Sequence, residues 1–230
     1  GPHRVVADLA SGGSEQLTAD AVLIATGARP RVLAEAVPDG ERILRWTDVY
    51  GLPELPERLV VVGSGVTGAE FAGAYQAMGA QVTLVSSRDR VLPGEDADAA
   101  QVLEEVFARR GMTVLSRARA VGVRRAGDGV AVTLQDGQVV EGSHALMAVG
   151  SVPNTDGLGL AEADVRTDER GYVVVDRVSR TSAPGVYAAG DVTGVLMLAS
   201  VAAMQGRIAI RHVLGESVQP LDLGVVASNV

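Results

Sequence analysis

The pattern of apolar and polar positions predicts alternating strands and helices in the centre of the chain. Residues 59–62 form a continuous β-branched and apolar run, typical of a buried strand, and a glycine-rich turn follows. Residues 67–78 are expected to form a helix that Gly79 ends, and residues 81–85 a second strand. This order of elements is that of a parallel βαβ unit.

A second helix and several short strands are expected after this unit. Apolar residues at helical spacing predict a helix over residues 97–110. Turns at residues 127–129 and 136–137 contain Gly and Asp-Gly, which favour tight hairpins. The short strands are expected at residues 113–115, 120–124, 130–134, 139–141 and 145–149.

The flanking regions carry weaker patterns. Residues 5–9 and 21–25 are expected to form short strands, and residues 31–57, which have no clear period, a connection. Near the end, a short strand leads to Gly190, and small and apolar residues predict a helix over residues 198–214. The chain starts without Met and enters a strand-like segment at once, so we expect it to be part of a longer protein.

One supersecondary unit is expected to occur twice. The segment at residues 21–30 reads AVLIATGARP, and the segment at residues 144–153 reads HALMAVGSVP. Each has a buried-strand pattern, then Gly and, three positions later, Pro, and each follows a hairpin with a glycine-containing turn. The repeat predicts two related domains in one chain.

Composition removes several kinds of chemistry. All 20 basic residues are Arg, so the chain offers no lysine for a Schiff base or for a Walker-type phosphate site. It has no Cys and only three scattered His, which makes a metal site improbable. With 28 Gly and 3% aromatic residues, the composition favours packed α/β layers over an aromatic β-sandwich.

Charge and hydropathy restrict the partners. The formal net charge is −8, which argues against nucleic acid and anionic membranes as main partners. The longest apolar stretch, around residues 195–204, is too short to span a bilayer, and no signal segment opens the chain. A cytoplasmic location is therefore the default expectation.

The strongest motif is the turn VVVGSGVTGAE at residues 60–70. A dinucleotide-binding turn needs Gly63 for a tight bend, Gly65 for backbone approach to a pyrophosphate and Gly68 for close packing of helix on strand. The phosphates then lie at the helix N-terminus, next to Ser64 and Val66. The motif follows a strand and precedes a helix, which favours a nucleotide site over a simple packing turn.

The tip of the second strand suggests which nucleotide binds. NAD sites usually have an acid there for the ribose 2′-hydroxyl, but this strand ends in the sequence SSRDR. Ser87 lies at the tip, and the guanidinium groups of Arg88 and Arg90 could pair with a 2′-phosphate. We therefore expect NADPH to be accepted at least as well as NADH. The alternative is that both arginines are solvated loop residues.

Gly190-Asp191 occupies a second strand end, just before a helix. A carboxylate there can accept hydrogen bonds from sugar or polyol hydroxyls, although Gly-Asp alone is a common turn. The Gly-Asp motif becomes far more specific in combination with three others. These are the Ala-Thr-Gly at residues 25–27, the Gly63 turn and the Gly150-x-x-Pro-Asn motif, which precede it in this order.

In these motifs the chain resembles the FAD-dependent pyridine nucleotide-disulfide oxidoreductases of the lipoamide dehydrogenase and glutathione reductase type. The amino-acid sequence of residues 64–71 and 86–96 is most similar to that of the lipoamide-dehydrogenase-like NAD(P)H quinone reductases that lack a redox cysteine pair. The resemblance implies an α/β fold with two three-layer Rossmann-like domains, each a parallel sheet plus a β-meander. The NAD(P)-binding domain is inserted in a partial FAD-binding domain.

The resemblance also implies roles for individual residues. It assigns Thr26, Gly27 and Asp191 to FAD and places Glu70 near the nicotinamide. The alternative for Glu70 is a carboxylate favoured in the first helical turn. Val66 stands where some relatives carry a Tyr gate over the flavin. Besides these residues, the expected cofactor-binding set contains Gly63, Ser64, Gly65, Gly68, Ser87, Arg88, Arg90, Gly150 and Gly190.

Domain limits follow from the same resemblance. We expect residues 1–55 to belong to the FAD-binding domain and its connection, 56–150 to the NAD(P)-binding domain, and 151–218 to the rest of the FAD-binding domain. Residues 219–230 would begin a C-terminal interface domain that makes a homodimer in the full-length protein. The upstream FAD turn and any redox cysteine pair would also lie outside the chain.

The resulting hypothesis is a flavoprotein that passes hydride from NAD(P)H to FAD and then to a small-molecule acceptor, with no acid–base residue required for the hydride step. A quinone is the favoured acceptor, and a disulfide, as in a dihydrolipoamide dehydrogenase-like enzyme, is the alternative. A non-catalytic nucleotide-binding regulator is the remaining alternative, because fold alone does not fix function.

Overall fold

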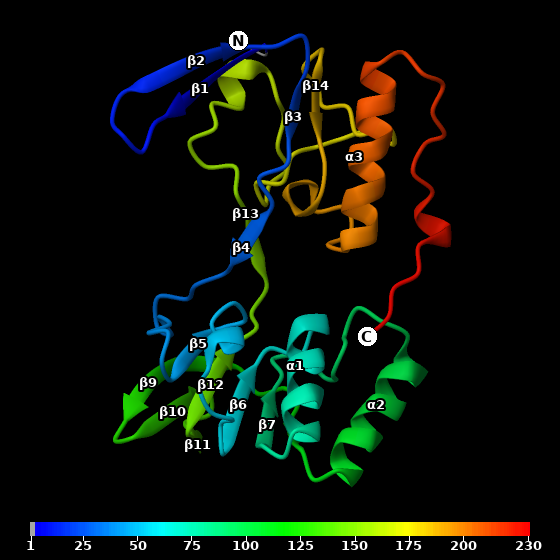
Figure 1. Cartoon of the computed structure of the whole chain (residues 1–230). Coiled ribbons are helices and arrows are strands. Elements are labelled where there is room, and N and C mark those ends of the chain that lie inside the picture. Colours follow the sequence, from blue (N-terminus) through cyan, green and yellow to red (C-terminus); the bar gives the residue numbers. More distant parts are fainter. Residues whose placement is uncertain (1–2) are drawn as a thin grey trace. The chain divides into compact units, whose positions relative to one another are not determined.

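The computed structural model describes residues 3–230, which divide into two compact units. One unit contains the chain up to Arg29 and residues Val152–Asn229, and the other contains Pro30–Ser151. Figure 1 shows the elements of each unit. Among the described residues, no helix combines the length and the apolar character that crossing a bilayer requires.

A five-stranded parallel sheet forms the centre of the unit at Pro30–Ser151. Its order is β5-β12-β6-β7-β8, and all four neighbouring pairs are parallel. The strands are β5 (Ile43–Arg45), β6 (Arg58–Val62), β7 (Gln81–Val85), β8 (Thr113–Leu115) and β12 (His144–Met147). The expected strand at residues 145–149 thus starts one residue earlier and ends at Met147.

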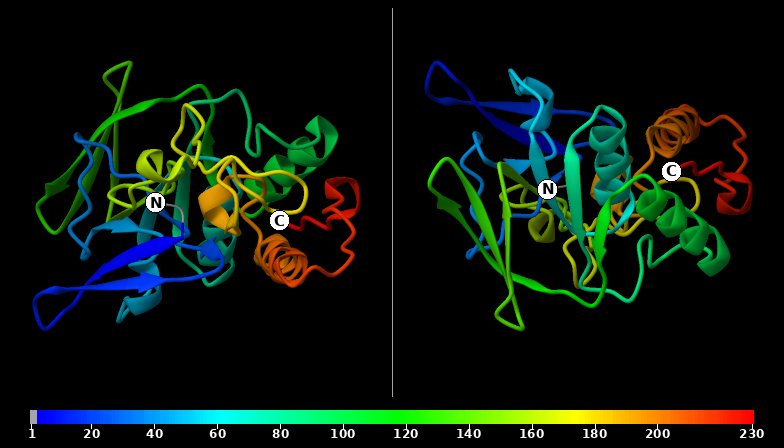
Figure 2. Two further views of the ribbon diagram at one scale, coloured as in Figure 1. Left: turned by 90° about the horizontal axis from the view of Figure 1, so that it is seen from above. Right: turned by 90° about the horizontal axis from the view of Figure 1, so that it is seen from below.

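Two helices cover one face of this sheet, and an antiparallel meander covers the other (Figure 1). The helices are α1 (Val66–Ala77) and α2 (Ala97–Arg109), and the meander is β9 (Ala120–Ala126), β10 (Gly129–Leu134) and β11 (Val139–Gly142). Figure 2 shows the same elements from above and below. The expected three-layer arrangement is therefore present in this unit.

Alternation along the strands explains the two hydrophobic cores. Leu59 and Val61 of β6 pack with α1 and α2, whereas Val60 and Val62 pack with β9 and β10. Successive side chains of a strand point to opposite faces, so a strand covered on both faces is apolar throughout. This is why residues 59–62 read as a continuous apolar run.

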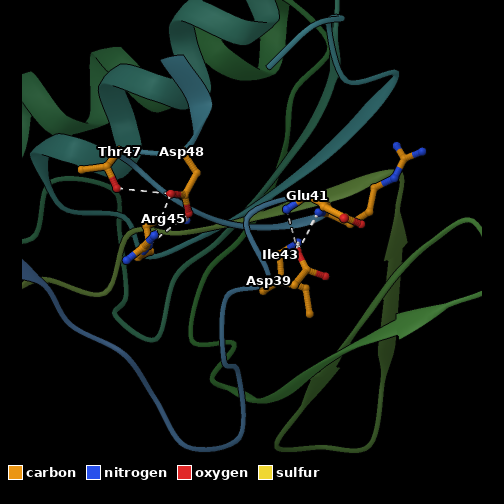
Figure 3. Close-up of polar contacts among 7 residues, drawn as sticks. Asp39, Glu41, Ile43, Arg45, Thr47 and Asp48 are labelled. Carbon is orange, nitrogen blue, oxygen red and sulfur yellow. Dashed lines mark hydrogen bonds and ion pairs between the residues drawn. The ribbon is translucent and has the colours of Figure 1, made fainter. Parts of the chain in front are cut away.

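The compact unit begins at Pro30, well before the domain boundary expected at residue 56. The segment interpreted as a connection contains β5, which pairs with β12 at the edge of the parallel sheet. Asp39 and Asp48 hold the two ends of this short strand (Figure 3). Asp39 Oδ1 accepts the N–H groups of residues 41–43, and Asp48 Oδ2 accepts the N–H group of Arg45 at 2.8 Å.

The other unit contains smaller sheets. The hairpin β1 (Arg4–Asp8) and β2 (Ser14–Thr18) is antiparallel, and β3 (Val22–Ile24) pairs in parallel with β14 (Val186–Ala188). In helix α3 (Ala199–Val213), the apolar residues Val201, Ile208 and Ala209 are buried. Short 3₁₀ helices lie in this unit at Ala161–Ala163, Asp191–Thr193 and Leu223–Val225, and another lies in the unit at Pro30–Ser151, at Val49–Gly51.

The predicted internal repeat is visible in the structure. Each copy has a strand, a glycine with positive φ and a short strand: β3, Gly27 and β4 (Ala28–Pro30), and β12, Gly150 and β13 (Ser151–Pro153). The two short strands pair with each other. Their ends make matching bonds, since Asn154 N donates to Gly27 O at 3.0 Å and Arg31 N donates to Gly150 O at 2.9 Å.

Candidate functional site

The glycine-rich turn lies at the carboxyl end of β6, where the chain enters α1. Gly63 follows the strand with φ +112°, in the region that favours glycine, and its N–H group donates to Val85 O at 2.9 Å. In open parallel sheets, ligands bind at the carboxyl ends of the strands, where the strand order reverses. Here β6 has β12 on one side and β7 on the other, which is such a position.

Gly63 and Gly68 are required by close packing. A Cβ atom on Gly63 would lie 2.2 Å from the carbonyl oxygen of Ala148, and one on Gly68 would lie 1.8 Å from the carbonyl oxygen of Gly63. Both distances are far below van der Waals contact. The predicted reasons for these two glycines, a tight bend and close contact of helix and strand, are therefore confirmed.

Gly65 differs from its two neighbours, because neither backbone strain nor packing requires it to be glycine. Its φ is −69°, and a Cβ atom there would meet no other atom within 4 Å. Gly65 is also the N-cap of α1, and no side chain caps that helix end. Open space in front of uncapped backbone N–H groups is the geometry that a phosphate group fits.

Two serines connect this turn to the tip of β7. The hydroxyl oxygens of Ser64 and Ser86 lie 2.6 Å apart, and both residues are buried. Ser64 O also accepts the N–H group of Leu92 at 2.8 Å. The turn and the loop after β7 are thus held as one structure. Ser86 was not among the expected site residues. The sequence signal for it was the pair of adjacent serines in the SSRDR motif, of which only Ser87 was predicted to belong to the site.

The loop after β7 presents the predicted cationic side chains. Ser87 and Arg88 are exposed, and Arg90 is partly buried. Arg90 Nη1 lies 3.9 Å from Asp89 Oδ2, while Arg90 Nε is buried without a hydrogen-bond partner among the described residues. No ion pair of Arg88 occurs among residues 3–230. Both guanidinium groups therefore have donors to offer to an anion.

Val66 and Glu70 lie on the same face of α1, because they are four residues apart. Both are exposed. Glu70 is the fifth residue of the helix, and no acidic residue occurs in its first turn. The alternative that Glu70 stabilises the helix N-terminus is therefore wrong. The role near a nicotinamide stays a prediction.

In the other unit, Thr26 and Gly27 form a bonded pair with Asn154. Thr26 Oγ1 donates to Asn154 O at 2.7 Å, and Asn154 Nδ2 donates to Thr26 O at 2.9 Å. Gly27 has φ +69°. Since the only hydroxyl proton of Thr26 is used in this bond, the side chain of Thr26 can act toward a ligand only as an acceptor.

The Gly190-Asp191 turn is fixed by a buried glutamine of α3. Gly190 N donates to Gln205 Oε1 at 2.8 Å, and Gln205 Nε2 donates to Thr193 Oγ1 at 3.3 Å. The Asp191 side chain is partly exposed and makes no hydrogen bond or ion pair with another described residue. A rigid backbone thus presents a free carboxylate, which fits the expected acceptor of ligand hydroxyls.

The buried histidine His144 lies away from the Gly63 turn. His144 begins β12, opposite Leu59, and is 8% exposed. Burial lowers the pKa of His144 below 6.5, and the nearby charges of Arg42 and Arg125 lower it further, against an opposing effect of Asp39. Arg42 Nη1 lies 3.1 Å from His144 Nε2 and can only donate, so Nε2 is the unprotonated nitrogen. His144 is a neutral structural residue.

The carboxylates near β5 are also structural. Burial alone would raise the pKa of Asp48, but the hydrogen bonds and charge of Arg45 outweigh it, so the pKa is lowered (Figure 3). Likewise, backbone N–H donors and Arg125 outweigh burial at Asp39 and lower its pKa. Within residues 3–230, no three His, Asp or Glu side chains are grouped so as to hold a metal ion.

Comparison with known proteins agrees with this geometry. Residues 2–206 match the family model of the pyridine nucleotide-disulphide oxidoreductases. The chain is 60% identical over 228 residues to an NAD(P)H dehydrogenase (quinone) of Mycobacterium tuberculosis, with 99% of this chain and 46% of the relative covered. It is 38% identical to a dihydrolipoyl dehydrogenase of Chlorobaculum tepidum, with 95% and 47% covered.

Solved structures give the same result. The crystal structure of LpdA from Mycobacterium tuberculosis superposes with a TM-score of 0.93 at 60% identity and covers 98% of this chain and 49% of that one. The flavoprotein disulfide reductase RclA from Escherichia coli has a TM-score of 0.84 at 26% identity, with 95% and 49% covered. The chain spans about half the length of these relatives.

Proposed function

The chain belongs to the pyridine nucleotide-disulphide oxidoreductase family, and on this premise we propose that it binds NAD(P)H at the Gly63 turn as part of a flavoprotein oxidoreductase. The other unit, with Thr26, Gly27 and Asp191, would bind FAD. Bound together, the cofactors supply hydride transfer from nicotinamide to flavin and reduction of a second acceptor. The protein contributes mainly binding and orientation.

The observation that carries the proposal is the open position at Gly65. Gly63 and Gly68 are explained by packing, whereas the space in front of Gly65 is open and leaves its backbone accessible to a ligand group. A pyrophosphate at this point would lie on the uncapped N-terminus of α1, between Ser64 and Val66. Glu70, one turn further along the helix, would lie toward the nicotinamide.

Arg88 and Arg90 support NADPH as a ligand at least as good as NADH. They follow the tip of β7, where the ribose of the adenosine half is expected in this fold. Arg88 has no ion pair among the described residues, and Arg90 has only the 3.9 Å approach to Asp89. The 2′-phosphate carries close to two negative charges, which paired guanidinium groups match well. Ser87, exposed beside them, can donate a further hydrogen bond.

A nucleotide titration with a matched glycine control tests the proposal. Titrating the chain with NADH and NADPH, followed by nicotinamide fluorescence, should show binding that Gly65→Ala weakens about tenfold or more, because the methyl group excludes the pyrophosphate. Gly51 also has open space where a Cβ atom would lie, and its φ is not positive. Gly51→Ala should leave affinity unchanged. Wild-type protein that binds neither nucleotide would contradict the proposal.

The acceptor is proposed to be a quinone, on the 60% identity to a relative with that name. A disulfide is the second candidate, on the identity to dihydrolipoyl dehydrogenases. Steady-state rates of the complete gene product with a soluble quinone and with lipoamide would separate them. A non-catalytic regulator would instead bind NAD(P)H without reducing flavin under anaerobic stopped flow. The cytoplasmic location and the homodimer stay predictions.

A further inference from the structure

The connection after β8 is bonded to the loop after β7 through its backbone. Ser86 N donates to Leu115 O at 2.8 Å, and Ala118 N donates to Ser86 O at 2.8 Å. The shortest of these bonds joins Arg117 N to Arg88 O at 2.7 Å. The main chains of Arg88 and Arg117 are therefore in direct contact, although the two residues lie far apart in the sequence.

Arg117 has an unusual backbone conformation for its residue type. Its φ is +55°, in the left-handed region that Gly and Asn occupy easily and that costs other residues about 1 kcal/mol or more. Glycine would remove this cost, yet a long cationic side chain is present. Strained residues of this kind concentrate at ligand sites, because the surrounding structure fixes where the side chain begins.

The side chain of Arg117 is exposed and has no acidic partner within residues 3–230. It lines a groove of about 680 Å³ together with Ser116, Arg119, Gln135 and Gln138. Asp136 is the one acidic residue that lines the same groove. Arg88 and Arg90 do not line this groove; what joins Arg117 to the loop after β7 is the bond between its main chain and that of Arg88.

We propose that Arg117 is a third specificity-determining residue for the adenosine 2′-phosphate, acting with Arg88 and Arg90. The inference rests on the proposed NAD(P)H site and adds to it a residue from a different strand connection. Arg88 and Arg90 approach the phosphate from the loop after β7, and Arg117 would approach it from the neighbouring connection. Three guanidinium groups in two bonded loops would discriminate NADPH from NADH more strongly than one flexible loop alone.

The Arg117→Gly variant tests this inference, because glycine keeps the positive φ and removes only the side chain. NADPH and NADH are titrated against the full chain, since they differ only in the 2′-phosphate. We expect Arg117→Gly to weaken NADPH binding about fivefold or more, the size of one charge-assisted contact, and to leave NADH binding within about twofold. Arg124→Ala removes an exposed arginine of β9 that has no acidic partner among the described residues, and it should change neither affinity.

Three results would overturn the inference. Equal weakening of both nucleotides would mean that Arg117 stacks on the adenine. If Arg124→Ala weakened NADPH binding as much as Arg117→Gly does, the effect would come from the loss of positive charge in general and not from a contact of Arg117. Unchanged NADPH affinity in Arg117→Gly, with intact NADPH preference in the wild type, would mean that Arg117 makes no contact. The proposed function fails separately, if the wild-type chain binds neither NADH nor NADPH.

Discussion

The hydroxyl oxygens of Ser64 and Ser86 lie 2.6 Å apart in the buried space between the glycine-rich turn and the end of β7. Ser86 Oγ also accepts the N–H group of Arg88 at 3.1 Å. One hydroxyl thus connects the proposed pyrophosphate site to the loop that carries the proposed 2′-phosphate residues. The two parts of the proposed nucleotide site are thus connected by hydrogen bonds through this serine pair.

Ser86→Ala should lower the free energy of unfolding and weaken nucleotide binding. The change leaves the Arg88 N–H group and the Ser64 hydroxyl without this partner, which costs about 1–3 kcal/mol when the groups are buried. Urea unfolding measures the stability, and NADPH titration measures the affinity. Ser217→Ala, at an exposed position, is the control and should change neither quantity. Stability equal to wild type in Ser86→Ala would show that the serine pair contributes nothing.

Gly68→Ala and Gly65→Ala should separate packing from ligand binding. A methyl group at Gly68 would overlap the Gly63 carbonyl and force α1 away from β6, whereas one at Gly65 enters open space. We expect Gly68→Ala to lower the free energy of unfolding by about 3 kcal/mol. Gly65→Ala should lower it by about 1 kcal/mol or less, the cost of a poorer N-cap residue.

Chemical denaturation of both variants, beside the wild type, is the measurement. Equal stability losses at the two positions would mean that the open space in front of Gly65 does not exist in solution. A loss at Gly65 alone would reverse the packing interpretation of the motif.

The stability of the protein should fall as the pH decreases from about 7 to 5, in part because of His144. Its pKa is lower in the folded protein than the ordinary value of 6.5, so the unfolded chain binds the additional proton in this range. His144 therefore makes its full contribution to the free energy of unfolding at pH values above its pKa in the unfolded chain. This contribution is lost as the pH falls below that pKa. The carboxylates with lowered pKa, such as Asp39 and Asp48, titrate at lower pH and act below this range.

Urea unfolding of wild type and His144→Gln at pH 7.5 and pH 5 checks this prediction. The glutamine variant should show the smaller difference between the two pH values. A His144→Gln variant with the full wild-type difference would assign the pH dependence to other groups.

The sequence alone determined the features that depend on neighbouring residues. The turn at residues 63–68, both flanking strands and α1 were predicted closely, because the glycine spacing and the apolar run are local signals. The internal repeat was also readable, since both copies keep the Gly-x-x-Pro pattern, and the structure gives both glycines positive φ. The helix predicted at residues 97–110 is α2, Ala97–Arg109.

Only the tertiary structure decided the features that depend on residues far apart in the chain. Strand β5 was missed because three residues between turns have no period of their own, and pairing with β12 makes them a strand. The contact of Arg117 with Arg88 and the bond between Ser64 and Ser86 join separate strand ends, which no local pattern encodes. The physical reason is that backbone conformation follows from adjacent residues, whereas hydrogen bonds across a sheet edge exist only after the strands have assembled.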